Sequence, residues 1–184
     1  MMATKTDKIL LVDDEEGIRK ILGLSLEDMG YTVETAANGA EALERYESFR
    51  PDIVLTDIKM PVMDGIELLQ KLKRENPDTE VIMITGHGEL DLAIKSLKYE
   101  ATDFVTKPIN DDVLEIALKR AGERIFMRHQ LREYTENLER LVAEKSRQVV
   151  EAVRALRAGG QPRSWMGTGH LVVRVTCGAS RGAV

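Results

Sequence analysis

Short apolar runs alternate with amphipathic stretches over residues 8–120. Four of five runs are largely apolar and end at charged or turn-forming residues, which is typical of parallel strands covered on both faces. One run, YTVETA, alternates apolar and polar positions and fits an edge strand. The five runs are KILLV (8–12), YTVETA (31–36), DIVLT (52–56), VIMIT (81–85) and DFVT (103–106).

The stretches between these runs have the spacing of helices. Gly30 and Pro51 follow the first two as stop signals, and Asn38, Asp64 and Asn110 precede the second, third and fifth as candidate N-caps. The predicted apolar stripes are Ile18, Ile21, Leu22, Ser25 and Met29; Ala42, Leu43 and Tyr46; Ile66, Leu69 and Leu72; Leu90, Ala93, Ile94 and Leu97; and Val113, Leu114, Ala117 and Leu118.

Five strand–helix units in strict alternation predict an α/β fold with a doubly wound, five-stranded parallel sheet. Right-handed crossovers restrict the topology further. We choose the flavodoxin-like strand order 2-1-3-4-5, although alternation alone does not prove that order. The predicted domain covers residues 1–120.

The fifth helical pattern continues without Pro from Asn110 to Ala158, and Gly122 is its single Gly. Its stripe, spaced 3, 4, 4, 3, 4, 4, 3, is Leu131, Tyr134, Leu138, Val142, Lys145, Val149, Val153 and Leu156. That spacing is an eleven-residue repeat, which favours a straight or slightly right-handed helix pair. We therefore predict that residues 121–158 form a dimerising coiled coil, with a single solvated helix as the alternative.

The composition changes abruptly after Ala158. Residues 159–184 contain no Asp, Glu or Lys, and their one strand-like run, HLVVRV, would bury little by itself. We interpret this segment as a disordered or non-native tail, and we expect its Trp165 to be exposed.

The bulk numbers fit one soluble domain with an appendage. The chain has 184 residues, of which 43% are hydrophobic and 31% charged, and its net charge of -5 argues against general nucleic-acid binding. The single cysteine, Cys177, excludes an internal disulfide. The N-terminal apolar run has only four residues, so it is neither a signal peptide nor a membrane span, and we expect a cytoplasmic protein without a membrane partner.

Polar residues stand directly at the ends of four strands. Asp13 and Asp14 follow the first strand, Asp57 the third, Thr85 ends the fourth, and Lys107 follows the fifth. Because all strands are parallel, these residues share the edge at which open α/β sheets bind ligands. Taken singly, Asp13, Asp14 and Asp57 are better explained as helix caps or turn formers, and a Thr or Lys at a strand end is ordinary. Five suitable residues at four matching strand ends would, however, rarely coincide.

The residue types at this edge predict phosphoryl-transfer chemistry. Three clustered carboxylates repel each other, and a hard cation with oxygen ligands such as Mg²⁺ relieves the repulsion. A carboxylate beside that cation, a hydroxyl and a compact ammonium group can attack phosphorus while the positive charges neutralise the phosphoryl oxygens.

Four motifs resemble the receiver domain of two-component response regulators over residues 7–125: LVDDE (11–15), LTDIKMPVMDG (55–65), ITGHG (84–88) and DFVTKP (103–108). The resemblance implies that Asp57 accepts a phosphoryl group from a sensor histidine kinase. It implies that Asp13, Asp14, Asp57 and the backbone carbonyl of Lys59 bind Mg²⁺. Thr85 and Lys107 would contact the phosphoryl group.

The same resemblance implies a switch made by Thr85 and Phe104, and a cis peptide between Lys107 and Pro108. Two positions depart from the family pattern: Glu100 stands where many members have Gly, and Phe104 lacks the hydroxyl of Tyr. The ITGHG loop is similar to that of regulators that drive transcriptional ATPases, but no output motif follows residue 125.

Three alternatives stay open. A haloacid-dehalogenase-like phosphatase needs a second Asp two residues after the first, and Lys59 at that place argues against it. A dimerisation scaffold would leave the acidic pocket idle, and a fragment of a larger regulator would have its output elsewhere.

We expect a phosphoacceptor that catalyses only its own phosphorylation and dephosphorylation. His87 is interpreted as a solvated loop residue, and His129 lacks the H-E-x-R-T-P context of a kinase phosphohistidine.

Overall fold

The computed structural model describes residues 8–86, 88 and 90–158. His87, Trp165, Cys177 and the predicted tail lie outside the described residues. The chain divides into two compact units, Met1–Tyr134 and Thr135–Val184.

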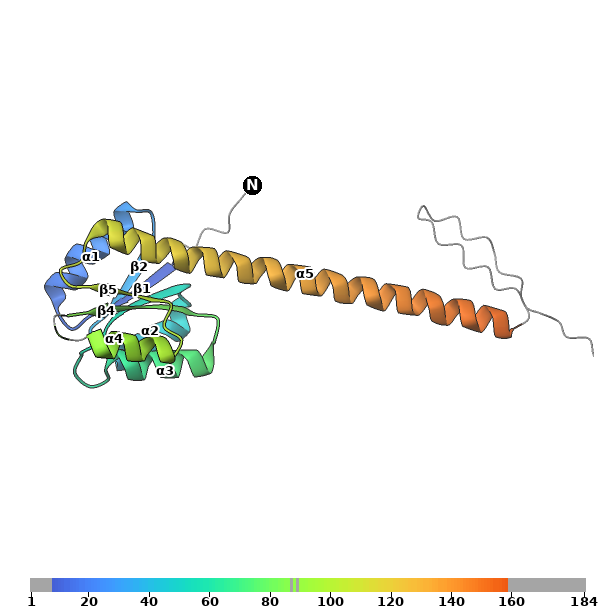
Figure 1. Ribbon diagram of the computed structural model, residues 1–184, viewed down its shortest axis with the longest axis horizontal. Coiled ribbons are helices and arrows are strands. Elements are labelled where there is room, and N and C mark those ends of the chain that lie inside the picture. Colours follow the sequence, from blue (N-terminus) through green and yellow to red (C-terminus); the bar gives the residue numbers. More distant parts are fainter. Residues whose placement is uncertain (1–7, 87, 89, 159–184) are drawn as a thin grey trace, which may run out of the picture. The chain divides into compact units, whose positions relative to one another are not determined.

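The first unit contains a parallel five-stranded sheet (Figure 1). The strands are β1 (Lys8–Val12), β2 (Thr32–Ala36), β3 (Ile53–Asp57), β4 (Glu80–Thr85) and β5 (Asp103–Thr106). Their order is β2-β1-β3-β4-β5, which confirms the predicted flavodoxin-like fold and its strand order. In register, Val12 pairs with Thr56, and Asp57 pairs with Ile84. The carboxyl ends of the three central strands therefore meet.

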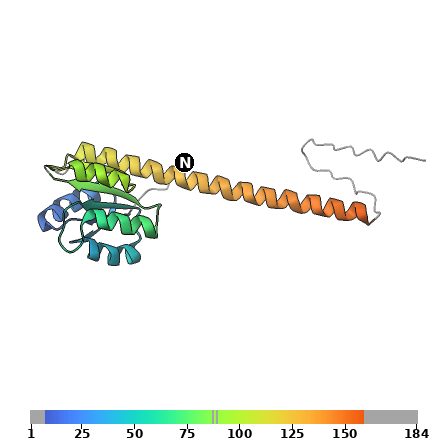
Figure 2. The same ribbon diagram turned by 60° about the horizontal axis from the view of Figure 1, so that its bottom comes forward.

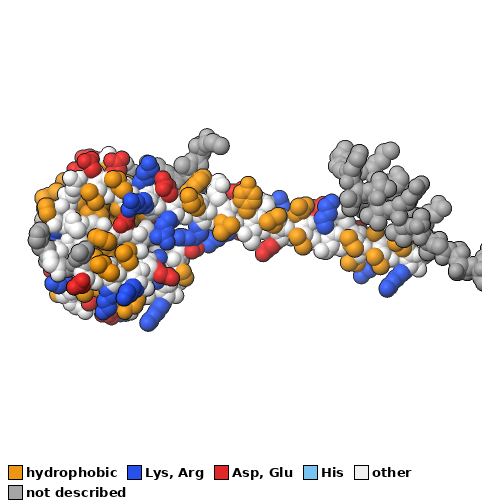
Figure 3. Space-filling model, viewed as in Figure 1, with side chains coloured by type: hydrophobic (Ala, Val, Ile, Leu, Met, Phe, Trp, Pro, Cys, Tyr) orange, Lys and Arg blue, Asp and Glu red, His pale blue; other side chains and the backbone are white. Residues whose placement is uncertain are grey.

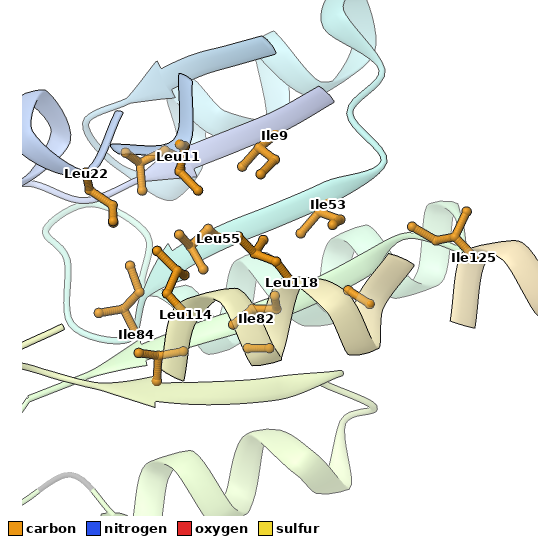
Figure 4. Close-up of a cluster of buried hydrophobic side chains, with 14 residues drawn as sticks. Ile9, Leu11, Leu22, Ile53, Leu55, Ile82, Ile84, Leu114, Leu118 and Ile125 are labelled. Atoms are coloured by element: carbon orange, nitrogen blue, oxygen red, sulfur yellow. The ribbon is translucent and has the colours of Figure 1, made fainter. Parts of the chain in front are cut away.

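Five helices connect and cover the strands (Figures 1 and 2). They are α1 (Glu16–Asp28), α2 (Gly39–Phe49), α3 (Gly65–Glu75), α4 (Leu90–Lys98) and α5 (Asp111–Arg157). Alternate strand residues point to opposite faces. One face packs against α1 and α5 through Ile9, Leu55, Leu22 and Leu114 (Figure 4). The other packs against α2, α3 and α4.

The helix boundaries follow the predicted signals. The side-chain oxygens of Asn38, Asp64 and Asn110 accept backbone N–H groups at 3.0, 2.7 and 2.8 Å, which caps α2, α3 and α5. After α1, Gly30 has a φ of 91°, and the N–H of Tyr31 donates to the Leu26 carbonyl at 3.1 Å. This is the left-handed helix ending that Gly favours.

The predicted apolar stripes are partly wrong. Five of their members are exposed: Ile21, Met29, Ile94, Leu97 and Val113. In α1 the buried face is formed by Leu22, Gly23 and Leu26, whereas Ile21 is 75% exposed. The reason is that α1 carries two overlapping apolar stripes at helical spacing, and only contact with the sheet decides which one is buried.

In the second unit α5 continues from Thr135 to Arg157. Large apolar side chains recur along it and are exposed in the single chain (Figure 3). Those on the predicted stripe are Leu138, Val142, Val149, Val153 and Leu156. The coiled coil stays a prediction. Among the described residues, none of the helices pairs the length with the apolar character that crossing a bilayer requires.

Candidate functional site

The fold brings Asp13, Asp57 and Lys107 into direct contact. The Lys107 Nζ donates to Asp13 Oδ2 at 3.0 Å and to Asp57 Oδ2 at 3.1 Å. Asp13 is fully buried and Asp57 is 7% exposed. The contact arises because β1 and β3 are neighbours, and because the backbone N–H of Lys107 is bonded to the Thr85 carbonyl at 2.7 Å.

The three predicted carboxylates form one cluster. A ligand oxygen from each of Asp13, Asp14 and Asp57 lies within 4.8 Å of the other two, and Asp14 is exposed while the other two are buried. One oxygen of each buried carboxylate accepts a hydrogen bond from a backbone N–H group: Asp13 Oδ1 accepts from Glu15 at 2.8 Å, and Asp57 Oδ1 accepts from Ile58 at 2.9 Å. An all-oxygen set of this kind fits a hard divalent cation such as Mg²⁺.

The cluster carries more negative than positive charge. Burial raises the pKa of Asp57 above its ordinary value, with a contribution from Asp13, and the hydrogen bond from Lys107 only partly offsets this. Burial alone would lower the pKa of Lys107, but its hydrogen bonds to Asp13 and Asp57 outweigh burial and raise that pKa. Lys107 therefore stays charged, and a divalent cation would neutralise the remaining carboxylates.

The loop after Asp57 approaches the site closely. The N–H of Gly65 donates to the Ile58 carbonyl at 2.9 Å, and a Cβ at Gly65 would lie 2.1 Å from the backbone oxygen of Asp57. Only a residue without a side chain can start α3 at this position. In the same loop the N–H of Met63 bonds the Pro61 carbonyl at 2.8 Å across Val62, whose φ is 70°.

Comparison with known proteins agrees with this geometry. The family model described as the response regulator receiver domain matches residues 9–119. The chain belongs to the response regulator receiver family.

Two curated relatives of this receiver are longer proteins. It is 40% identical over 127 residues to the nitrogen assimilation regulatory protein NtrX of Azorhizobium caulinodans, covering 68% of this chain and 28% of NtrX. It is 40% identical over 113 residues to the DNA-binding transcriptional regulator NtrC of Escherichia coli K12, covering 61% of this chain and 24% of NtrC. The chain thus spans about a quarter of the length of these relatives.

Solved structures give the same fold. A response regulator receiver domain protein from Clostridium thermocellum is 38% identical with a TM-score of 0.62, covering 64% of this chain and 95% of that one. NtrX from Brucella abortus is 32% identical with a TM-score of 0.66, and the match covers 69% of this chain and 29% of that one. The resemblance that the motifs indicated is confirmed.

The remaining predicted residues surround the receiver site at different depths. Thr85 is buried at the end of β4, and its hydroxyl donates to the Gly86 carbonyl at 3.4 Å. Phe104 is partly buried beside Met83 and packs in the cluster on the α2–α3–α4 face. Lys59 is exposed directly after the buried Ile58. The Lys107–Pro108 peptide is cis, as the resemblance implied.

Three residues near the receiver site were missed from the sequence. Glu15 Oε1 lies 3.7 Å from Lys107 Nζ, and Arg19 Nη1 donates to the Asp13 carbonyl at 2.6 Å. Gly65, the last residue of the LTDIKMPVMDG motif, had been given no role of its own. Glu15 was visible in the LVDDE motif, but a charged residue just before a helix gives no signal that it reaches a lysine far along the chain.

Proposed function

We propose that the chain is a phosphorylation-activated, cytoplasmic response regulator in which Asp57 accepts a phosphoryl group from the histidine of a sensor kinase. The observation that carries the proposal is the buried Asp57 carboxylate, held at the sheet edge next to Asp13 and 3.1 Å from the Lys107 ammonium. The family match supports the same chemistry.

In the transfer, an Asp57 carboxylate oxygen attacks phosphorus as the phosphorus–nitrogen bond of the donor phosphohistidine breaks. Asp13, Asp14, Asp57 and the Lys59 carbonyl would hold Mg²⁺, which supplies positive charge to the phosphoryl oxygens. Lys107 already lies between two carboxylates and can turn its charge to the incoming group. The Thr85 hydroxyl supplies a further hydrogen bond.

Phosphorylation would draw Thr85 toward the phosphoryl group and let Phe104 fill the vacated space. Thr85 and Phe104 belong to the neighbouring strands β4 and β5, so the surface formed by α4, β5 and α5 would repack. Because α5 continues into residues 121–158, we propose that this helix carries the output and pairs with a second copy.

The phosphoacceptor role is tested with labelled acetyl phosphate and Mg²⁺. We expect the wild-type chain to gain an acid-stable, alkali-labile label and Asp57→Asn to gain none. Equal labelling of both proteins, or no labelling of either, would contradict the receiver proposal. It would favour a dimerisation scaffold whose acidic pocket has no catalytic role. Steady turnover of added phosphate esters would instead favour the phosphatase alternative, against which Lys59 already argues.

A second candidate is that the chain is the front part of a longer transcriptional regulator. The supporting observation is that it matches only 28% of NtrX and 24% of NtrC, the latter named as a DNA-binding transcriptional regulator. Sequencing the genomic reading frame across the codon for Ala158 tests this. A continuous frame into an ATPase or DNA-binding segment supports it, and a stop codon directly after that point contradicts it.

A further inference from the structure

A buried carboxylate lies at the edge of the sheet opposite Asp57. Glu80 is the first residue of β4 and is fully buried, whereas Thr85, five residues later, ends the same strand at the phosphoacceptor site. The Thr102 hydroxyl, just before β5, donates to Glu80 Oε2. A buried carboxylate needs charged partners as well as hydrogen bonds, because isolated charges are costly away from water.

Those partners come from α5. Arg124, Arg128 and Arg132 are spaced four residues apart and so share one face of the helix. Arg128 Nη2 bonds Glu80 Oε1, and Arg124 Nε lies 3.6 Å from Glu80 Oε2. Arg128 and Arg132 also reach Asp78 Oδ1 and Oδ2, at 3.2 and 2.8 Å, and Arg128 donates to the Asp78 carbonyl.

This contact extends the attachment of α5 beyond its apolar packing. The last buried apolar residue of α5 is Ile125, and the receiver family match ends at residue 119. Arg128 and Arg132 lie one and two turns further on, yet the Arg128 side chain is only 28% exposed. By contrast, Leu131 and Tyr134 on the same turns are each 68% exposed.

We propose that Asp78 and Glu80, with Arg124, Arg128 and Arg132, form a clamp that fastens residues 121–132 of α5 to the start of β4. The clamp holds α5 just after residue 119, where the match to the receiver family ends and the predicted helical extension of residues 121–158 begins. Because β4 carries Thr85 at its other end, the clamp is also a contact, beyond the apolar packing, through which a movement of β4 reaches residues 121–132 of α5. This second role rests on the proposed function, and the fastening does not.

The test is amide hydrogen exchange of the full chain with and without Mg²⁺ and beryllofluoride, a phosphoryl analogue. Two clamp variants are compared. Arg128→Ala leaves the buried Glu80 carboxylate without its main charged partner and could destabilise the whole domain. The double variant Glu80→Gln/Arg128→Leu removes both charges of the pair, so it leaves no buried charge unpaired. Arg120→Ala is the matched control, since it removes an exposed ion pair, 2.8 Å long, between α5 and Asp103.

Without the analogue, we expect the amide exchange rates of residues 121–134 to rise at least about tenfold in both clamp variants, while the rates in β3 stay unchanged. Arg120→Ala should exchange like wild type in both regions. Unchanged exchange in residues 121–134, or an equal rise in all elements, overturns the clamp. With the analogue, wild type should change its exchange in this segment and Glu80→Gln/Arg128→Leu should not. A response that persists in that variant overturns the coupling. Acetyl phosphate labelling of Asp57, measured separately, shows whether the receiver function itself has failed.

Discussion

Asp57 is held in a position that disfavours its own charge. Its folded-state pKa is raised, chiefly by burial, so the folded state binds a proton more tightly than the unfolded state does. Ionised Asp57 therefore destabilises the fold at neutral pH when no cation is bound, and this cost decreases as the pH falls below the folded pKa and is gone below the unfolded pKa. Asn keeps the shape of the side chain and removes the charge, although its single oxygen can accept only one of the two hydrogen bonds that Asp57 receives from Ile58 and Lys107.

We therefore expect Asp57→Asn to be more stable than wild type in EDTA at pH 7, because removing the buried charge outweighs the lost hydrogen bond. The difference should shrink as the pH is lowered, because wild-type Asp57 then becomes protonated. Adding Mg²⁺ should stabilise wild type more than the variant. Urea unfolding at two pH values measures both effects, and a variant that is less stable in EDTA at pH 7 would contradict the expectation.

At the residue scale, the sequence predicted which side chains share the sheet edge better than it predicted the contacts among them. Asp13, Asp57 and Lys107 could be found because parallel strands place all their carboxyl ends at one edge. The close approach of Gly65 to Asp57 could not, because it depends on how the loop folds back over β3. The switch role of Thr85 and Phe104 came from the family pattern, since strand ends alone assign no switch.

At the element scale, α4 ends in a strained turn. Glu100 has a φ of 66°, and the N–H of Ala101 donates to the Ser96 carbonyl at 3.1 Å, which is the helix ending that normally takes Gly. The sequence had marked Glu100 as a departure from the family pattern, and the structure gives its physical meaning: a side chain in a left-handed conformation.

Replacing this residue should stabilise the domain. We expect Glu100→Gly to raise the unfolding free energy by about 0.5 to 1 kcal/mol, because relief of the left-handed strain exceeds the added freedom of the unfolded chain. Thermal unfolding followed by circular dichroism measures the change. Glu100→Gln removes the charge and keeps the Cβ, so it should leave the melting temperature unchanged. An equal gain from both variants would assign the effect to charge instead.

The strands and helix caps were predictable because each depends on local sequence: alternation, turn residues and an oxygen at the N-cap. The buried face of α1 was not. Leu22 and Leu26 face the sheet while Ile21 and Leu24 are exposed, and both pairs have hydrophobicity typical of a core. Which pair is buried depends on the angle at which α1 packs against the sheet. The spacing of apolar residues along the sequence carries no information about that angle.

At the scale of the whole molecule, the long helix raises a question of stability. From Thr135 to Arg157 its side chains are almost all exposed, including Leu138, Val142 and Val149. Helices rely on tertiary packing of an apolar face for most of their stability in water. The eleven-residue repeat supplies such a face, so a second copy of the chain is the occupant that we predict.

We expect the wild-type chain to be a dimer at micromolar concentrations by sedimentation equilibrium. Leu138→Glu should weaken the dimer by at least about tenfold, because a carboxylate on the stripe would be desolvated or would force the helices apart. Arg140→Glu, which changes a side chain on another face of the same turn, should leave the dimer intact. A monomeric wild type would favour the single solvated helix, and equal weakening by both variants would show that net charge, rather than the stripe, controls the pairing.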